Sequence, residues 1–169
     1  DRGFWDVPIQ LDIQDGSEEQ RAIINKIHKR ISEILESHLD RNGLSFSYST
    51  LYHYKDCLTP RPLHVDTLSP QVKAFLIITD VSELKSGPYA YIPRSHRHRI
   101  VHKLNSLINF LYKSDLGDDI NDACLHGSSS AIPVLATKGT LLLTRQDGVH
   151  GDLPADCGFG KTVMVFAYQ

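Results

Sequence analysis

The sequence has few cysteines, and they form no recognisable pair. Cys57, Cys124 and Cys157 are widely spaced, odd in number and without a Cys-x-x-Cys motif. This spacing argues against a disulfide framework and against a cysteine-based zinc site. We therefore expect a protein of a reducing compartment, and a cytoplasmic location is the simplest prediction.

An excess of charge of one sign is also missing. Lys and Arg number 18 against 20 Asp and Glu, a formal net charge of -2, so there is no electrostatic footprint for nucleic acid or an anionic membrane. No apolar run approaches the roughly 20 residues that a membrane-spanning helix requires, and the first residues lack the pattern of a signal peptide. We expect a soluble protein with no nucleic-acid partner and no membrane span.

The apolar content is sufficient for one core. The 169 residues are 41% hydrophobic, which suits a single domain over residues 1–169. The sequence begins at Asp1 rather than Met and ends within the apolar run "KTVMVFAYQ". We therefore expect a processed product or a piece of a longer chain.

The hydrophobic periodicity changes along the chain. Residues 17–39 have the apolar spacing of an amphipathic helix behind a capping-box pair, Ser17 and Gln20. From residue 44 the period becomes that of a strand, and short β-prone runs continue to the C-terminus. A second helical pattern and a polar stretch, about 100–130, are expected to form an insertion in a β core of about 44–169. The pattern favours an antiparallel β-sandwich or barrel with flanking helices.

Two residue types that bind metals precede a strongly β-prone run. In "LHVD", His64 and Asp66 are two positions apart, so on an extended segment their side chains project from the same face. His150, in a Gly- and Asp-rich connection between two expected strands, could supply a third ligand. Two histidines and one carboxylate are the facial ligand set of non-haem Fe(II) oxygenases. On these residues alone, a hydrogen-bonded structural histidine is the more common explanation.

Four segments together resemble the phytanoyl-CoA dioxygenase family of Fe(II)- and 2-oxoglutarate-dependent oxygenases. They are "LHVD", "KAFLIITDV", "GPYAYIPRSHRHR" and "KGTLLLTRQDGVHGDLP", which occur in the family's order between about Leu44 and the C-terminus. The segment Gly-Pro-x-x-x-Ile-Pro-x-Ser-His at 87–96 is the most distinctive. The resemblance implies a mainly β fold with flanking helices, the double-stranded β-helix or cupin-like jelly-roll barrel.

The resemblance also implies a site. His64, Asp66 and His150 would bind Fe(II), and Lys161 would hold the distal carboxylate of 2-oxoglutarate, at a position where the family usually has arginine. Tyr54, on the aromatic strand, is a second candidate for binding the co-substrate, although a tyrosine stripe at this period is more often core.

Two features leave alternatives open. Asp152 occupies a position where the family often has a small hydroxyl residue, and a carboxylate there would repel the co-substrate. The basic segment "RSHRHRIVHK", residues 94–103, would suit an anionic substrate at the rim of a site. A solvated turn and helix start is the more common explanation of such a segment, and we favour it.

With Fe(II), 2-oxoglutarate and O2, the family hydroxylates C–H bonds and releases succinate and CO2. The resemblance therefore implies an oxidoreductase that acts on a small-molecule substrate, and the carboxylate of Asp66 favours hydroxylation over halogenation. A prolyl-hydroxylase-like oxygenase acting on a peptide or protein is one alternative, which the lysine at 161 supports. A non-catalytic β-barrel binding domain is another, with Asp152 as its main support.

Overall fold

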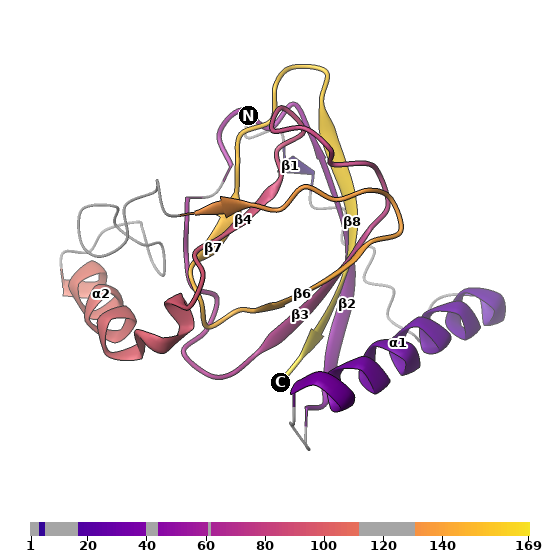
Figure 1. Cartoon of the computed structure of the whole chain (residues 1–169), viewed down its shortest axis with the longest axis horizontal. Helices are drawn as coiled ribbons and strands as arrows, with labels where there is room; N and C mark the ends of the chain where they lie inside the picture. The colour runs from indigo at the N-terminus through magenta and orange to yellow at the C-terminus, as the bar shows by residue number, and fades with distance from the viewer. Residues whose placement is uncertain (1–3, 6–16, 40–43, 61, 112–130) are drawn as a thin grey trace.

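Two antiparallel β-sheets face one another across the interior of the protein (Figure 1). The computed structural model describes residues 4–5, 17–39, 44–60, 62–111 and 131–169. The strand order is β1-β2-β8-β3-β6 in the larger sheet and β5-β4-β7 in the smaller one. The strands are β1 Phe4–Trp5, β2 Phe46–Lys55, β3 Val72–Ile77, β4 Tyr89–Tyr91, β5 Ile132–Pro133, β6 Leu141–Arg145, β7 His150–Asp152 and β8 Gly160–Tyr168.

Strand β8 is the centre of the larger sheet. It pairs with β2 on one side and β3 on the other, and every residue from 163 to 168 is buried. Burial on both faces suits its near-continuous apolar sequence. Met164, Phe166 and Tyr168 belong to a core on the outer face, whereas Val163 and Val165 belong to a second cluster on the inner face. The two faces of one strand therefore serve the core and the cavity described below.

Helix α1, Glu18–Leu39, covers the outer face of the larger sheet (Figure 1). It begins at the expected capping box, in which Ser17 N–H donates to Gln20 Oε1 at 2.9 Å and Gln20 N–H donates to Ser17 Oγ at 3.3 Å. The apolar stripe of the helix then packs on alternate residues of the sheet. The buried members of this layer are Ile24, Ile31, Leu35, Val72, Ala74, Met164, Phe166 and Tyr168.

A bulge near the start of β2 changes which face its aromatic residues occupy. The pairing with β8 shifts register between Phe46 and Tyr48. A strict period of two would place Phe46, Tyr52 and Tyr54 on one face, but Phe46 packs in the outer core and the two tyrosines pack in the inner cluster. The extra residue of the bulge therefore turns Tyr52 and Tyr54 towards the interior.

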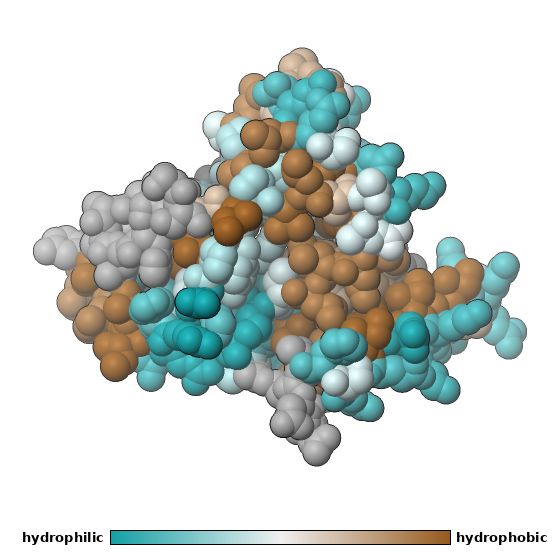
Figure 2. Space-filling model, in the orientation of Figure 1, coloured by the Kyte–Doolittle hydropathy of each residue, from teal (hydrophilic) through white to brown (hydrophobic). Residues whose placement is uncertain are grey.

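Helix α2, Arg99–Leu111, carries an apolar face that is exposed (Figure 2). Ile100 and Phe110 are 76% and 78% exposed, whereas the buried positions of this helix are polar. Those positions are His102, Asn105 and Asn109. The remainder of the expected insertion, residues 112–130, lies outside the described residues. Neither of the two described α-helices combines the length and apolar character that crossing a bilayer requires.

Truncation of the outer core is expected to destabilise the fold strongly. Phe166 is completely buried between α1 and the sheet, so Phe166→Ala should lower the free energy of unfolding by about 3–5 kcal/mol. Urea denaturation measures this change. The control Leu84→Ala, at a position 57% exposed, should change it by about 0.5 kcal/mol or less. Equal effects of the two substitutions would contradict this assignment of the core.

Candidate functional site

Two backbone hydrogen bonds join His64 to His150. The N–H of His64 donates to the His150 carbonyl at 2.8 Å, and the N–H of His150 donates to the His64 carbonyl at 2.9 Å. His64 lies in the connection after β2, whereas His150 begins β7. The bridge therefore brings together two distant parts of the sequence, and it holds the imidazole centroids 4.5 Å apart.

The backbone also fixes the orientation of both imidazoles. Nδ1 of His64 lies 2.8 Å from the Pro62 carbonyl, and Nδ1 of His150 lies 2.8 Å from the Gly148 carbonyl. A carbonyl only accepts hydrogen bonds, so Nδ1 carries the hydrogen in each ring and Nε2 presents a lone pair when the ring is neutral. Both Nε2 atoms point to Asp66, at 3.2 Å from Oδ1 for His64 and 3.6 Å from Oδ2 for His150.

The three side chains form a donor set that fits a metal ion. Their ligand atoms lie within 4.8 Å of one another. Burial lowers the pKa of His150, which keeps its ring neutral. Burial alone would raise the pKa of Asp66, but the adjacent His150 and His64 side chains and the charge of Lys73 hold it well below its ordinary value. An ionised carboxylate therefore faces the Nε2 atoms of two imidazoles, and a divalent cation would satisfy all three side chains.

Lys73 is a member of this site that the sequence analysis missed. Its Nζ lies 2.5 Å from Asp66 Oδ2, and its side chain is only 13% exposed. It therefore restrains one carboxylate oxygen and leaves Oδ1 next to His64. The available signal was a single lysine within the otherwise apolar strand "VKAFLI", because a charged residue in a buried strand requires a partner.

Ser95, from the distinctive segment at 87–96, holds the backbone just before His150. Its Oγ donates to the Ile92 carbonyl at 2.7 Å and accepts the Val149 N–H at 2.7 Å. Gly148 passes so close to this point that a Cβ atom there would collide with the Tyr91 hydroxyl. The glycine and the serine together set the path of the backbone into β7.

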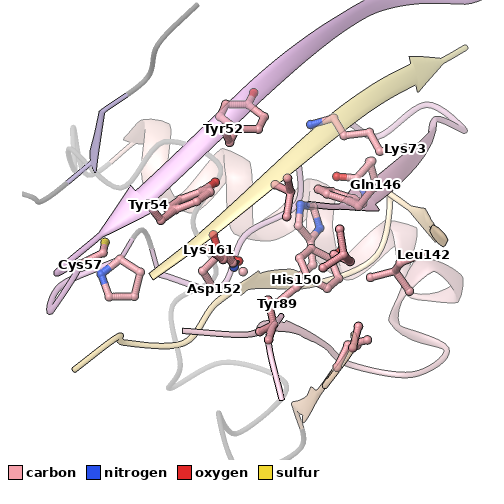
Figure 3. Close-up of a pocket in the computed structure, with 18 of the residues that line it drawn as sticks. Tyr52, Tyr54, Cys57, Lys73, Tyr89, Leu142, Gln146, His150, Asp152 and Lys161 are labelled. Carbon is pink, nitrogen blue, oxygen red and sulfur yellow. The ribbon is translucent and has the colours of Figure 1, made fainter. Parts of the chain in front are cut away.

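The three metal-ligand candidates lie at the wall of a cavity between the sheets. Figure 3 shows His150 among the lining residues. The cavity has a volume of about 340 Å³, within the range of about 300–1,000 Å³ that is usual for small-molecule sites. Its apolar lining is Phe75, Ile77, Val81, Leu142 and Val163, among others, and its polar lining includes Tyr54, Lys73, Gln146, Asp152 and Lys161.

Lys161 and Tyr54, the two residues expected to bind the co-substrate, are neighbours in this wall. They are paired across β2 and β8, and Lys161 Nζ lies 4.9 Å from the centroid of the Tyr54 ring. Lys161 donates to the Gly87 carbonyl at 2.7 Å and to Asp152 Oδ1 at 2.5 Å. Burial, and after it the charge of Asp152, raises the pKa of Tyr54, so its phenol stays protonated and donates a hydrogen bond to Asp152.

Gln146 supplies a second polar group that the sequence analysis did not identify. Its side chain is completely buried, and Nε2 donates to Thr144 Oγ1 at 2.6 Å. Its Oε1 has no hydrogen-bond partner among the described residues, and the residue lines the cavity. A buried acceptor without a partner suits a bound molecule that offers an N–H or O–H group.

The basic segment at 94–103 does not contribute to the described lining of the cavity. Arg99 lies 3.4 Å from the buried carboxylate of Asp147, and the His102 ring lies 2.9 Å from the Ser95 carbonyl. Arg94 and Arg97 are exposed. The segment therefore combines internal contacts with a solvated surface, as the favoured interpretation of the sequence expected.

No family model matches the sequence, and no curated protein matches it. Solved structures match its fold. AviO1 from Streptomyces viridochromogenes Tue57 is 17% identical over 99% of this chain and 73% of its own, with a TM-score of 0.67. EvdO2 from Micromonospora carbonacea var. aurantiaca, complexed with 2-oxoglutarate, is 17% identical over 83% and 63%, with a TM-score of 0.57.

HygX from Streptomyces hygroscopicus, with iron bound, is 18% identical over 74% of this chain and 58% of its own, with a TM-score of 0.51. The chain thus spans less than two thirds of EvdO2 and of HygX. At these identities the likeness shows the fold, and it confirms the mainly β jelly-roll barrel with flanking helices.

Removal of the Ser95 hydroxyl should make the position of His150 less well fixed. Because Ser95 Oγ bonds to Val149 N–H in a buried position, Ser95→Ala should lower the free energy of unfolding by about 1–3 kcal/mol and weaken Co(II) binding. Thermal denaturation and calorimetric titration with Co(II) measure the two effects. Ser82→Ala, at an exposed position, is the control. An unchanged Co(II) affinity in Ser95→Ala would show that the hydrogen bond between Ser95 and Val149 does not affect the metal site.

Removal of a histidine from the cluster should abolish tight metal binding. In His150→Ala one of the three converging ligand atoms is lost, so we expect the affinity for Co(II) to fall by about 100-fold or more. The matched control is His53→Ala, which removes an exposed imidazole that contacts Thr162. Circular dichroism checks that both variants fold. Wild-type affinity in a folded His150→Ala variant would exclude this metal centre.

Proposed function

We propose that the chain is a non-haem Fe(II)- and 2-oxoglutarate-dependent dioxygenase that hydroxylates a C–H bond of a small organic substrate and releases succinate and CO2. The observation that carries this proposal is the convergence of His64, Asp66 and His150 at the wall of a cavity. In this proposal, His64, Asp66 and His150 hold Fe(II), and Lys161 and Tyr54 bind 2-oxoglutarate. The bound metal and 2-oxoglutarate supply, with O2, the oxidising power that a C–H bond requires.

The charges of the cavity support a co-substrate with two carboxylates. Among the described residues of the lining, the charges of Asp66 and Asp152 are matched by the ammonium groups of Lys73 and Lys161. A divalent metal ion adds two positive charges, which a dianion such as 2-oxoglutarate neutralises. A buried site that ends without net charge avoids a large desolvation cost. The fold relatives crystallised with 2-oxoglutarate and with iron support the same pair of ligands.

The dimensions of the cavity favour a small-molecule substrate over a polypeptide. A volume of about 340 Å³ accommodates a small organic molecule beside the co-substrate, and the buried Oε1 of Gln146 suits a substrate that carries a hydroxyl or amino group. We infer a cytoplasmic enzyme, since the three cysteines are odd in number and form no Cys-x-x-Cys pair.

Anaerobic titration of the Fe(II)-loaded protein with 2-oxoglutarate tests the proposal. Chelation of the metal by the co-substrate gives a visible metal-to-ligand charge-transfer band, which we expect in the wild type. In Lys161→Ala, loss of the buried ammonium should raise the 2-oxoglutarate concentration at half-saturation by roughly tenfold or more. Lys138→Ala, at an exposed position, is the matched control. No band in a folded, iron-loaded wild type would remove 2-oxoglutarate from the proposal.

A further inference from the structure

The carboxylate of Asp152 occupies the two donors that the proposed co-substrate needs. Lys161 Nζ donates to Asp152 Oδ1 at 2.5 Å, and the protonated phenol of Tyr54 donates to the same carboxyl group. Asp152 follows His150 by two positions on β7, so both side chains project from one face of the strand into the cavity (Figure 3). An internal carboxylate therefore takes the place expected for the distal carboxylate of 2-oxoglutarate.

The two partners in this ion pair differ in how firmly they are held. Lys161 is 5% exposed in its side chain, donates to the Gly87 carbonyl at 2.7 Å and lies over the Tyr54 ring. The Asp152 side chain is 19% exposed, and it has only two side-chain torsions to change. The contacts therefore fix the ammonium on its strand and leave the carboxylate as the partner that can turn away.

We propose that Asp152 is an internal competitor of 2-oxoglutarate, which binds Lys161 and Tyr54 only when the Asp152 carboxylate turns away from them. This inference rests on the function proposed above and adds a determinant of co-substrate affinity to it. Two carboxylates next to one buried ammonium would repel each other, so the two occupants exclude one another. Without co-substrate, Asp152 keeps Lys161 from being an unpaired buried charge.

The competition predicts that removal of the Asp152 carboxylate will strengthen the binding of 2-oxoglutarate. Asp152→Asn preserves the size of the side chain but removes its charge. Asp152→Ser removes the charge and also makes the side chain too short to contact Lys161. In the Fe(II)-loaded protein, we expect either substitution to lower the 2-oxoglutarate concentration at half-saturation of the charge-transfer band by roughly tenfold or more. Asp156→Asn, at an exposed carboxylate four positions along the chain, is the matched control and should equal the wild type.

Two further measurements separate competition from damage to the fold or to the metal site. Co(II) affinity should be unchanged in Asp152→Asn, because Asp152 is not one of the clustered ligands. Its melting temperature without co-substrate should fall, since Lys161 loses its partner, and saturating 2-oxoglutarate should raise it more than in the wild type.

The possible outcomes of the titration differ clearly. A band that forms at a lower 2-oxoglutarate concentration in Asp152→Asn or Asp152→Ser than in the wild type supports competition. Half-saturation at the wild-type concentration or above in both variants overturns the competition but leaves the proposed function intact. No band in any of the proteins, with iron bound, overturns the proposed function and the competition with it.

Discussion

The backbone bridge between His64 and His150 is the contact on which the rest of the site depends. It is made by main-chain groups, so it exists before any metal ion binds. It joins the connection after β2 to the smaller sheet, and it fixes the separation of the imidazoles, whose Nδ1 atoms are held by two further carbonyls. A site preorganised in this way binds a metal ion without paying the entropy of bringing its ligands together.

The charged groups around the cavity are arranged in pairs. Lys73 contacts Asp66, and Lys161 contacts Asp152, with each pair largely removed from solvent. Such pairs add little net stability, but an unpaired charge at the same depth would be costly. In the proposed function, ligand binding at this cavity is therefore an exchange of ion-pair partners. A cation at Asp66 shares it with Lys73, and an anion at Lys161 competes with Asp152. Because of this pairing, the affinity for a ligand depends on charged side chains that do not contact the bond that reacts.

The sequence was most informative where local spacing determines the geometry. The i, i+2 relation of His64 and Asp66 indicated a shared face, and in the structure their side chains do lie together. The fold class followed from the change of period and from the resemblance. Lys73 was missed because its partner depends on a loop seven residues earlier, and the pairing of Asp152 with Lys161 depends on strands of different sheets facing one another. Neither contact has a periodic signal.

The lysine at 161 is well matched to an acid at 152. An arginine would present a planar fork, which holds a carboxylate through two parallel hydrogen bonds and would bind Asp152 firmly. An ammonium is a compact charge with three donors, of which Lys161 directs one to the Gly87 carbonyl and one to Asp152. It can exchange one carboxylate for another without changing its own position. Compared with the family that the sequence resembles, the lysine at 161 and the acid at 152 are therefore best understood as one feature, a cation whose resting partner is supplied by the protein.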